Sequence, residues 1–204
     1  MHRSIRPRGV SLIELIVTSS IVVLLLGEVW MMMSVGSRFY LKTRAQTEVQ
    51  TSALLGLRWL SKDLAEGSTF SLRQYDPDST DFPSTHNGIS FGSPKDNNEQ
   101  VYYNDSGVLL WTSIVGYYID PDSNVLYRTK LPLSPRVPAA PRIDDSVHHI
   151  DILAARTDRR RIAGHAIRLE AVQNARNVAV TLKCRNEELG FGLTLKTRLE
   201  MKNK

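Results

Sequence analysis

The sequence predicts an α+β protein in which a long N-terminal α-helix packs on an antiparallel β-sheet head. Three observations support this prediction. Residues 12–35 form an apolar run, and no proline occurs between residues 8 and 76. Apolar side chains then recur at helical spacing up to residue 64. Beyond residue 67, short β-prone runs alternate with turns rich in Asn, Asp, Gly and Pro.

Residues 1–9 form a basic leader that accounts for much of the basicity of the chain. They contain Arg3, Arg6 and Arg8 and no acid. Without them, the formal net charge of the 204-residue chain falls from +5 to +2. Such a leader stays on the cytoplasmic side of a membrane under the positive-inside rule. The high isoelectric point is therefore weak evidence for a nucleic-acid partner, and we do not expect one.

Residues 10–36 are predicted to be a hydrophobic transmembrane helix. The run 12–35 would span ~36 Å as an α-helix, which exceeds the ~30 Å hydrocarbon core of a bilayer. Its only ionisable side chains are Glu14 and Glu28. Glu28 and Trp30 are expected at the far interface, where an acid reaches water and an indole prefers the boundary. These features predict a single-pass membrane protein.

Residues 37–66 are predicted to continue the helix as an amphipathic segment. Apolar residues step along it by four, four, three and four positions, which keeps one face apolar: Val49, Ala53, Leu57, Leu60 and Leu64. Arg44 and Glu48 form an i,i+4 pair on another side. The alternative is two separate helices that are hinged at Gly36.

Residues 67–204 are predicted to form one globular β-rich head, because about 140 residues suffice for a compact domain. We expect strands at residues 69–72, 88–91, 101–103, 108–111, 115–119, 125–130, 165–169, 178–184 and 192–201, the last two as an antiparallel pair. Residues 131–141 hold four prolines and are expected to lack regular structure. Residues 147–155 fit either a strand or a helix.

The one cysteine, Cys184, cannot form an intramolecular disulfide. It falls on the alternating pattern of residues 178–184. We therefore expect a buried structural thiol.

The most informative segment is residues 8–15, Arg-Gly-Val-Ser-Leu-Ile-Glu-Leu. A charged side chain inside a membrane helix costs roughly 2.5–3.5 kcal/mol on insertion scales, so the glutamate needs an explanation. The segment closely resembles the processing site of type IV prepilins and type II secretion pseudopilins. The resemblance implies that a prepilin peptidase and methyltransferase cuts after Gly9 and methylates the amine of Val10. Valine departs here from the phenylalanine that the family usually has.

Two plainer interpretations explain less of this segment. A cleaved secretory signal has a small-residue site after its apolar region and no acid within that region. The small residues available there are Gly27, Ser34 and Gly36, with Glu28 among them. A simple membrane anchor explains the hydrophobicity, but it leaves the glycine and the glutamate of residues 8–15 without a role.

The resemblance also assigns roles within the helix. After cleavage, Glu14 is the fifth residue and lies one helical turn from the amine of Val10. A carboxylate and an ammonium in a low dielectric each lower the other's cost of staying charged. In the family, this glutamate instead meets the amine of the neighbouring subunit and sets the axial register. The filament-core contacts are then expected to begin with Leu12, Ile13, Leu15 and Ile16.

Three weaker resemblances point to a minor subunit. Residues 115–128 contain Val-x-Tyr-x-Ile, an acidic turn and Leu-Tyr-Arg, as in the J-type minor pseudopilins of type II secretion and the W-type minor pilins of type IV pili. Residues 195–203 look like the last strand of these proteins. Residues 59–64 are similar to the Leu-x-x-Asp-Leu stretch late in their long helix.

The resemblance implies a structural subunit at or near the tip of a pseudopilus or pilus, where it aids the initiation of assembly. It places the chain in a bacterial inner membrane, with the head on the periplasmic side, before assembly into the filament. The implied partners are the prepilin peptidase, other minor and major subunits, the inner-membrane assembly platform and secreted cargo.

Motifs for metal binding or catalysis are incomplete. Asp120, Asp122 and Asn124 have the spacing that opens an EF-hand loop, but Val125 and Leu131 stand where that loop needs glycine and a bidentate acid. We expect an ordinary turn and no metal. The pair His148-His149, near Asp151, lacks a third well-spaced ligand. The sequence has no nucleophile motif and no phosphate-binding glycine loop, so we expect neither an enzyme nor a cofactor.

One dense basic cluster leaves an alternative function open. Arg156, Arg159, Arg160 and Arg161 surround Asp158, and no aromatic residue interleaves them in the sequence. A solvated loop or a subunit contact explains this cluster. Phosphate contacts would instead indicate a DNA-binding or adhesive tip pilin of a competence system or type IV pilus. A membrane-anchored head of unrelated activity is the other alternative.

Overall fold

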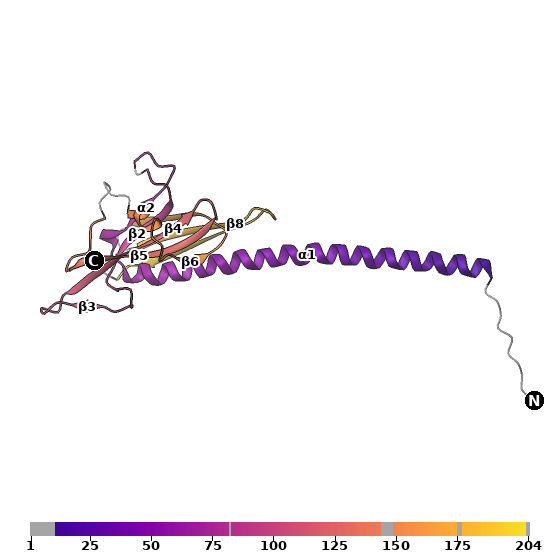
Figure 1. Ribbon diagram of the computed structural model, residues 1–204, viewed down its shortest axis with the longest axis horizontal. Helices are drawn as coiled ribbons and strands as arrows, with labels where there is room; N and C mark the ends of the chain where they lie inside the picture. The colour runs from indigo at the N-terminus through magenta and orange to yellow at the C-terminus, as the bar shows by residue number, and fades with distance from the viewer. Residues whose placement is uncertain (1–10, 82, 144–148, 175–176, 203–204) are drawn as a thin grey trace, which may run out of the picture. The chain divides into compact units, whose positions relative to one another are not determined.

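The computed structural model describes residues 11–81, 83–143, 149–174 and 177–202, and it confirms the α+β class (Figure 1). Within these ranges, one long helix, α1 (Leu12–Glu66), precedes a region of antiparallel strands. The chain divides into two compact units, Met1–Arg44 and Ala45–Lys204. We refer to Ala45–Lys204 as the head unit. The second half of α1 therefore belongs to the same unit as the strands.

The strands of the head unit form two antiparallel sheets. The larger has the order β1-β2-β4-β5-β6, with β3 paired to β4, and the smaller has the order β7-β8-β9. The strands are β1 (Arg73–Tyr75), β2 (Asn87–Ser93), β3 (Tyr102–Tyr103), β4 (Leu109–Asp120), β5 (Val125–Val137), β6 (Arg160–Ala163), β7 (Ala166–Asn174), β8 (Asn177–Asn186) and β9 (Phe191–Glu200). Two short helices, η1 (Thr69–Ser71) and α2 (His149–Ala154), complete the described elements.

The helix α1 continues through Gly36 without interruption, so the alternative of a hinge at this residue is wrong. It ends where the amide of Gly67 donates to the carbonyls of Asp63 and Leu64, at 3.1 Å each. A glycine just past the last turn commonly ends a helix in this way, because its amide reaches back to carbonyls that have lost their helical partners.

The second half of α1 packs its apolar face onto both sheets. Of the five predicted face residues, Leu57 is partly buried and the other four are fully buried. Their cluster takes in Phe91 and Leu126 of the larger sheet and Leu169 and Leu182 of the smaller one. The predicted amphipathic face is confirmed. It forms the centre of the core because the two sheets share this one helix as a common support.

The strands β8 and β9 form the predicted antiparallel pair, with Val178 opposite Leu199 and Cys184 opposite Leu193. Cys184 is buried, and burial raises the pKa of its thiol to about 11. The thiol is therefore neutral at physiological pH and serves as a small core side chain, as predicted.

Three segments of the head differ from the prediction. Residues 69–71 form the 3₁₀ turn η1 and not a strand, because the hydroxyl of Ser68 accepts the amide of Phe70 and caps the turn. The predicted strands 108–111 and 115–119 are one strand, β4. The strand β6 was not predicted, and it pairs with β5 through Leu126 opposite Ala163 and Arg128 opposite Arg160.

The proline-rich segment 131–141 also differs, because β5 continues through Pro132 and Pro135 to Val137. Proline has no N–H to donate to a neighbouring strand, so it is tolerated where the ladder is irregular. The register of β5 against β4 shifts between Trp111 and Ser113, next to the pairing of Ser113 with Pro132. This irregularity accommodates the prolines that suggested a loop.

Side-chain amides join the two sheets where backbone pairing stops. Strand β7 lies beside β2. The amide of Leu169 donates to Oδ1 of Asn87 at 2.6 Å, and that of Ala171 donates to Oε1 of Gln74 at 2.9 Å. A buried N–H without a partner costs about 1–3 kcal/mol. The side chains of Asn87 and Gln74 therefore remove the cost of two unpaired backbone N–H groups where the two sheets meet.

Gly56 allows α1 to approach the sheets closely, and this predicts an effect of substitution. A Cβ at this position would lie 2.8 Å from Cδ2 of Leu182 and 3.4 Å from Cβ of Ala163. We expect Gly56→Ala to destabilise the head unit by about 1–3 kcal/mol, because the overpacking exceeds the gain in helix propensity. The measurement is thermal unfolding of the purified full-length protein in detergent, followed by near-UV circular dichroism.

Gly36→Ala is the matched control, since nothing lies within 4 Å of a Cβ at this helical position. It should leave the head transition unchanged. An equal or higher melting temperature for Gly56→Ala would show that the helix does not depend on close approach at this glycine.

Candidate functional site

The start of α1 is a capping box built from Ser11 and Glu14. The amide of Glu14 donates to Oγ of Ser11 at 3.2 Å, and the amide of Ser11 donates to Oε2 of Glu14 at 2.9 Å. The amide of Leu15 donates to the carbonyl of Ser11 at 3.1 Å. Each side chain thus satisfies an N–H that the first helical turn would leave without a partner. This capping role was not predicted from the sequence, although Ser-x-x-Glu before an apolar run is the usual signal of a capping box.

The predicted processing residues, Gly9 and Val10, lie outside the described residues. Cleavage after Gly9 and methylation of Val10 therefore stay predictions. The first described helical turn does place the Glu14 carboxylate at the N-terminal end of α1, where a negative charge is favoured by the helix dipole.

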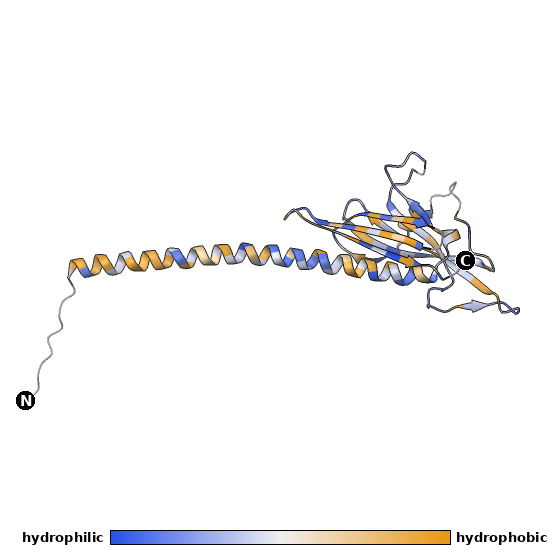
Figure 2. Ribbon diagram, turned by 180° about the vertical axis from the view of Figure 1, so that it is seen from behind, coloured by the Kyte–Doolittle hydropathy of each residue, from blue (hydrophilic) through white to orange (hydrophobic). Residues whose placement is uncertain are grey.

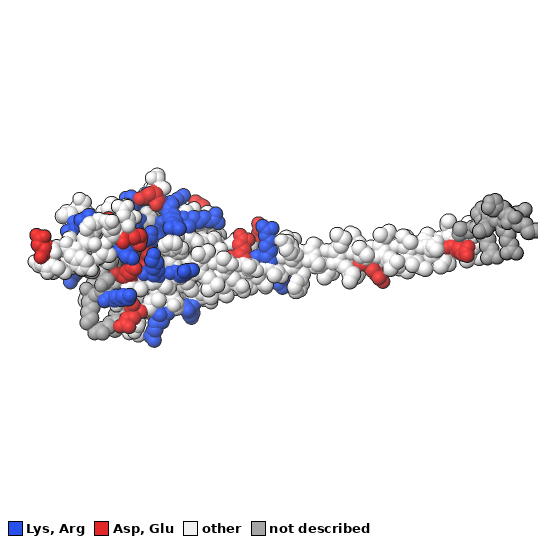
Figure 3. Space-filling view, turned by 90° about the horizontal axis from the view of Figure 1, so that it is seen from below, with Lys and Arg blue, Asp and Glu red and all other residues white. Residues whose placement is uncertain are grey.

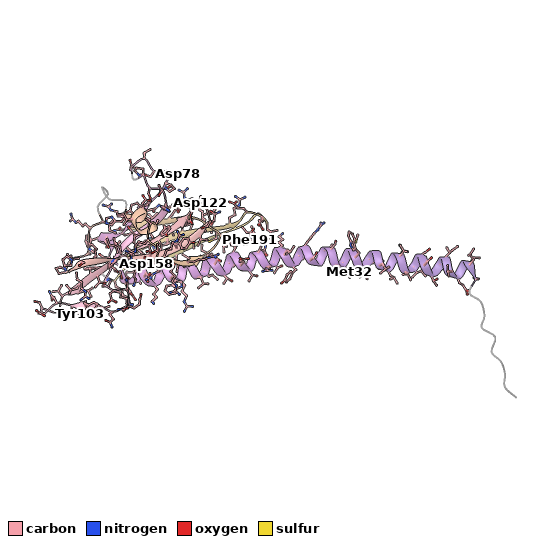
Figure 4. All side chains as sticks on the ribbon, viewed as in Figure 1. Met32, Asp78, Tyr103, Asp122, Asp158 and Phe191 are labelled. Atoms are coloured by element: carbon pink, nitrogen blue, oxygen red, sulfur yellow. The ribbon has the colours of Figure 1, made fainter. Side chains whose placement is uncertain are left out.

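The first half of α1 exposes its apolar side chains. The predicted filament-core residues are all exposed, from 54 % for Ile16 to 76 % for Leu12, with Ile13 and Leu15 between these values. In Figure 2, the ribbon of this half of the helix is mostly orange, the colour of hydrophobic residues, with a few paler and blue positions. Met32, which Figure 4 labels, projects from the helix and is 75 % exposed. Such a surface is far larger than soluble monomers tolerate.

By length and composition, α1 is the one helix among the described residues that could cross a membrane. Three hydroxyl groups in its apolar stretch find acceptors within the helix. Thr18 donates to the carbonyl of Glu14 at 2.7 Å, and Ser19 and Ser20 donate to that of Ile16 at 2.9 and 2.8 Å. No hydroxyl donor of these three residues therefore needs water, which suits a nonaqueous environment.

The apolar stretch of α1 carries few charged side chains. In Figure 3, lysine and arginine side chains lie on the head unit and on the part of α1 next to it, whereas the apolar half of α1 shows acids only. From Ser11 to Ser37 the sequence contains Glu14 and Glu28 and no basic residue. Glu14 is thus the charge nearest the start of the helix after the leader.

The last turns of α1 are fixed to the larger sheet by a buried carboxylate, Asp63. Its Oδ2 accepts the hydroxyl of Tyr117 at 2.6 Å and Nε of Arg128 at 2.5 Å. Asp63 is 7 % exposed and the Arg128 side chain 11 %. Burial and the neighbouring Asp63 charge hold the pKa of Tyr117 well above its ordinary value. The phenol therefore stays protonated and donates to the carboxylate.

A second layer of ion pairs surrounds this group and balances its charge. Nζ of Lys130 lies 2.8 Å from Glu99, and Nζ of Lys95 lies 2.8 Å from Glu66 at the end of α1. Partial burial raises the pKa of Glu99, but the hydrogen bond to Lys130 and the charges of Lys130, Arg128 and Lys95 together outweigh this effect, so the pKa is lowered. With Asp63 and Arg128, three acids thus face three bases. The arrangement joins helix and sheet and leaves no charge unpaired.

The acidic turn between β4 and β5 is explained by its own hydrogen bonds. Oδ1 of Asp120 accepts the amide of Asp122 at 3.2 Å, and Oδ2 accepts the hydroxyl of Ser123 at 2.9 Å. Asn124 adopts a φ of 52°, a conformation that asparagine tolerates better than most residues. The predicted turn is confirmed.

Asp151 is engaged by residues that the sequence did not bring together. Its Oδ1 accepts the hydroxyl groups of Ser84 and Thr85 at 2.9 and 2.7 Å, and Nδ1 of His86 lies 2.9 Å from the same oxygen. In a catalytic triad, a hydroxyl would bond to Nε2 of the histidine. None does so at His86 among the described residues. The cluster instead fastens α2 to the turn before β2.

Among the described residues, the histidine that contacts Asp151 is His86. His148 lies outside the described residues, and His149 belongs to α2. Within the described ranges, no three His, Cys, Asp or Glu side chains are grouped so that they could hold a metal ion.

No aromatic residue interleaves the basic cluster in the sequence, but in the structure aromatic residues from other segments lie against it. The guanidinium of Arg160 lies 4.4 Å from the centroid of the Trp59 ring, and that of Arg159 lies 4.5 Å from the centroid of Tyr127. Arg156 is apart from these contacts and pairs with Asp158, which Figure 4 labels, at 2.6 Å.

Neither a family model nor a curated protein nor a solved structure matches the chain. Its function must therefore be inferred from the residues described above.

The buried carboxylate predicts an unequal response to two substitutions in one network. We expect Asp63→Ala to destabilise the head unit by about 3–5 kcal/mol, because it leaves Arg128 charged and without its buried partner. Tyr117→Phe should cost only about 1–2 kcal/mol, because the ion pair survives. Urea unfolding of the two full-length variants in detergent measures both values. Equal losses would mean that the ion pair contributes nothing beyond a neutral hydrogen bond.

Proposed function

We propose that the protein is a minor pilin or pseudopilin, a structural subunit at or near the tip of a type II secretion pseudopilus or a type IV pilus. The observation that carries this proposal is the join at residues 8–15. A basic leader and a glycine precede α1, and a glutamate lies in its first turn. The apolar side chains of this half of the helix are not covered by the chain itself. A membrane anchor alone explains the apolar side chains but neither the glycine nor the glutamate.

In this proposal, the exposed half of α1 is the assembly element. It lies in the inner membrane after synthesis and then packs among the corresponding helices of other subunits. Burial of each large aliphatic side chain contributes about 1.5–3 kcal/mol relative to water. Moving these side chains from lipid to filament changes the free energy much less, because both environments are apolar. Tight helix–helix packing and a specific polar pair must then determine the arrangement.

Glu14 supplies that polar pair. Cleavage after Gly9 creates an amine at Val10, one residue before the capping box. The hydrogen bond from the amide of Ser11 keeps the Glu14 carboxylate at the end of the helix, close to where an incoming amine would lie. An unpaired carboxylate is costly in an apolar environment, whereas a paired one loses most of that cost. Subunits in the correct axial register are therefore favoured over those out of register.

The proposal also covers topology and partners. The three leader arginines stay in the cytoplasm until a prepilin peptidase removes them, and the head unit faces the periplasm. The other partners are the minor and major subunits, the inner-membrane assembly platform and secreted cargo. The role is to aid the initiation of assembly, with the head unit supplying contacts to neighbouring subunits or to the cargo.

Glu14→Ala tests the assembly role directly. We expect this variant to insert in the membrane and to be processed, but to be lost from sheared filaments and from co-purified minor subunits. The reason is that no other acid lies in the first turn of α1. The measurement is quantitative immunoblotting of the sheared fraction against total membrane protein, in cells that lack the wild-type copy.

Ser11→Ala is the control, because it removes the hydroxyl of the capping box and keeps the carboxylate. Loss of this cap costs about 1 kcal/mol, and we expect assembly to persist. Equal loss of both variants from filaments would mean that Glu14 acts as a helix cap and not as a partner of the amine. Normal incorporation of Glu14→Ala would refute both roles.

A further inference from the structure

Three exposed basic side chains lie close to Trp59 in the head unit, and we call them the basic surface. Arg58 and Lys62 come from α1, whereas Arg160 comes from β6. The Trp59 ring lies between the helix and the strand, with Lys62 Nζ 5.5 Å and the Arg160 guanidinium 4.4 Å from its centroid. Segments about 100 residues apart in the sequence thus form one surface.

The Trp59 ring holds the arginine of the basic surface in place. The guanidinium of Arg160 lies over this ring, 4.4 Å from its centroid. A guanidinium that covers a ring with its face keeps the N–H groups on its edge free to bond. The stacked side chain has already lost conformational entropy, so binding a ligand at its edge costs less entropy.

The charges of the basic surface are not balanced within the head unit. Among the described residues, no carboxylate forms an ion pair with any of these three side chains. Arg58 and Lys62 stand at i,i+4 on the helix, where like charges are destabilising. Arg160 also lies directly opposite Arg128 in the β5–β6 register, but only Arg128 has a carboxylate, Asp63. The network around Asp63 thus pairs its acids with its bases, whereas the cations of the basic surface have no paired acid within the described ranges.

We propose that the basic surface binds an acidic segment of a partner protein, with a carboxylate chelated by the edge of Arg160. A carboxylate matches the fork of a guanidinium with two parallel hydrogen bonds. The other two cations, Arg58 and Lys62, stabilise the neighbouring acids of the segment. This site does not depend on the proposed filament role, because it requires only the head unit and a partner of opposite charge.

Two features favour an acidic protein segment over a nucleic acid. The ring of Trp59 is covered by cations and is not offered to nucleobases for stacking. The run of basic residues is also interrupted by Asp158, which pairs with Arg156. The described part of the head therefore has no extended row of basic side chains here that could follow a phosphate backbone. The net charge of the whole chain, +5, is too small for a strong general attraction to nucleic acid.

The test uses the purified full-length protein in neutral-lipid nanodiscs and a fluorescein-labelled decaglutamate peptide, with binding measured by fluorescence anisotropy. Arg160→Lys keeps the charge and removes the fork. We expect it to weaken binding about tenfold. Arg198→Lys is the matched control on β9, because Arg198 is also exposed and has no ring or acid contact among the described residues. It should leave the affinity unchanged.

Two results would overturn the proposal. If Arg160→Lys and Arg198→Lys bind the peptide equally well, the attraction is a general effect of charge and no site exists. If a ten-nucleotide single-stranded DNA binds more tightly than the peptide, and Arg160→Lys weakens it, the surface recognises nucleic acid. Neither result bears on processing or assembly, so failure here is distinguishable from failure of the filament role.

Discussion

The exposed apolar side chains on the first half of α1 impose the constraint on which the rest of this chain depends. The helix offers lipid or other helices a surface that water cannot solvate cheaply, and three of its hydroxyl groups are already bonded within the helix. The free energy that would come from covering this surface is not available to the isolated chain. The rest of the protein must therefore fold as a stable unit without it, and the head unit does so around the second half of the same helix.

The head unit separates two uses of charge. Around Asp63, acids and bases are close and equal in number, and they fix the end of α1 to the larger sheet. Near Trp59, Lys62 and Arg160 are exposed and form no ion pair among the described residues, although they are close to this network. Ion pairs of the first kind hold elements in place, whereas unopposed charges on rigid supports favour an external anion. Neighbouring residues of α1 thus have different roles: Asp63 holds the fold together, and Lys62 is available to a partner.

Local patterns predicted the helix and the β8–β9 pair, because their periodicity survives in the fold. The face from Val49 to Leu64 is buried as its spacing indicates. The failures have two causes. Pro132 and Pro135 suggested a loop, but pairing with β4 through a register shift overrides the local preference. The contacts of Asp151 with His86 and of Arg160 with Trp59 join segments 65 and about 100 residues apart, and no single stretch of sequence contains them.

The most direct test of the central claim is the mass of the N-terminal peptide of the protein isolated from the membranes of its own cells. Intact-protein and peptide mass spectrometry identify the first residue and any modification of its amine. The filament-subunit interpretation predicts that the chain begins at Val10 and that this amine carries one methyl group. A chain that begins at Met1 with its basic leader intact would contradict it, and α1 would then be an anchor for a head of another function.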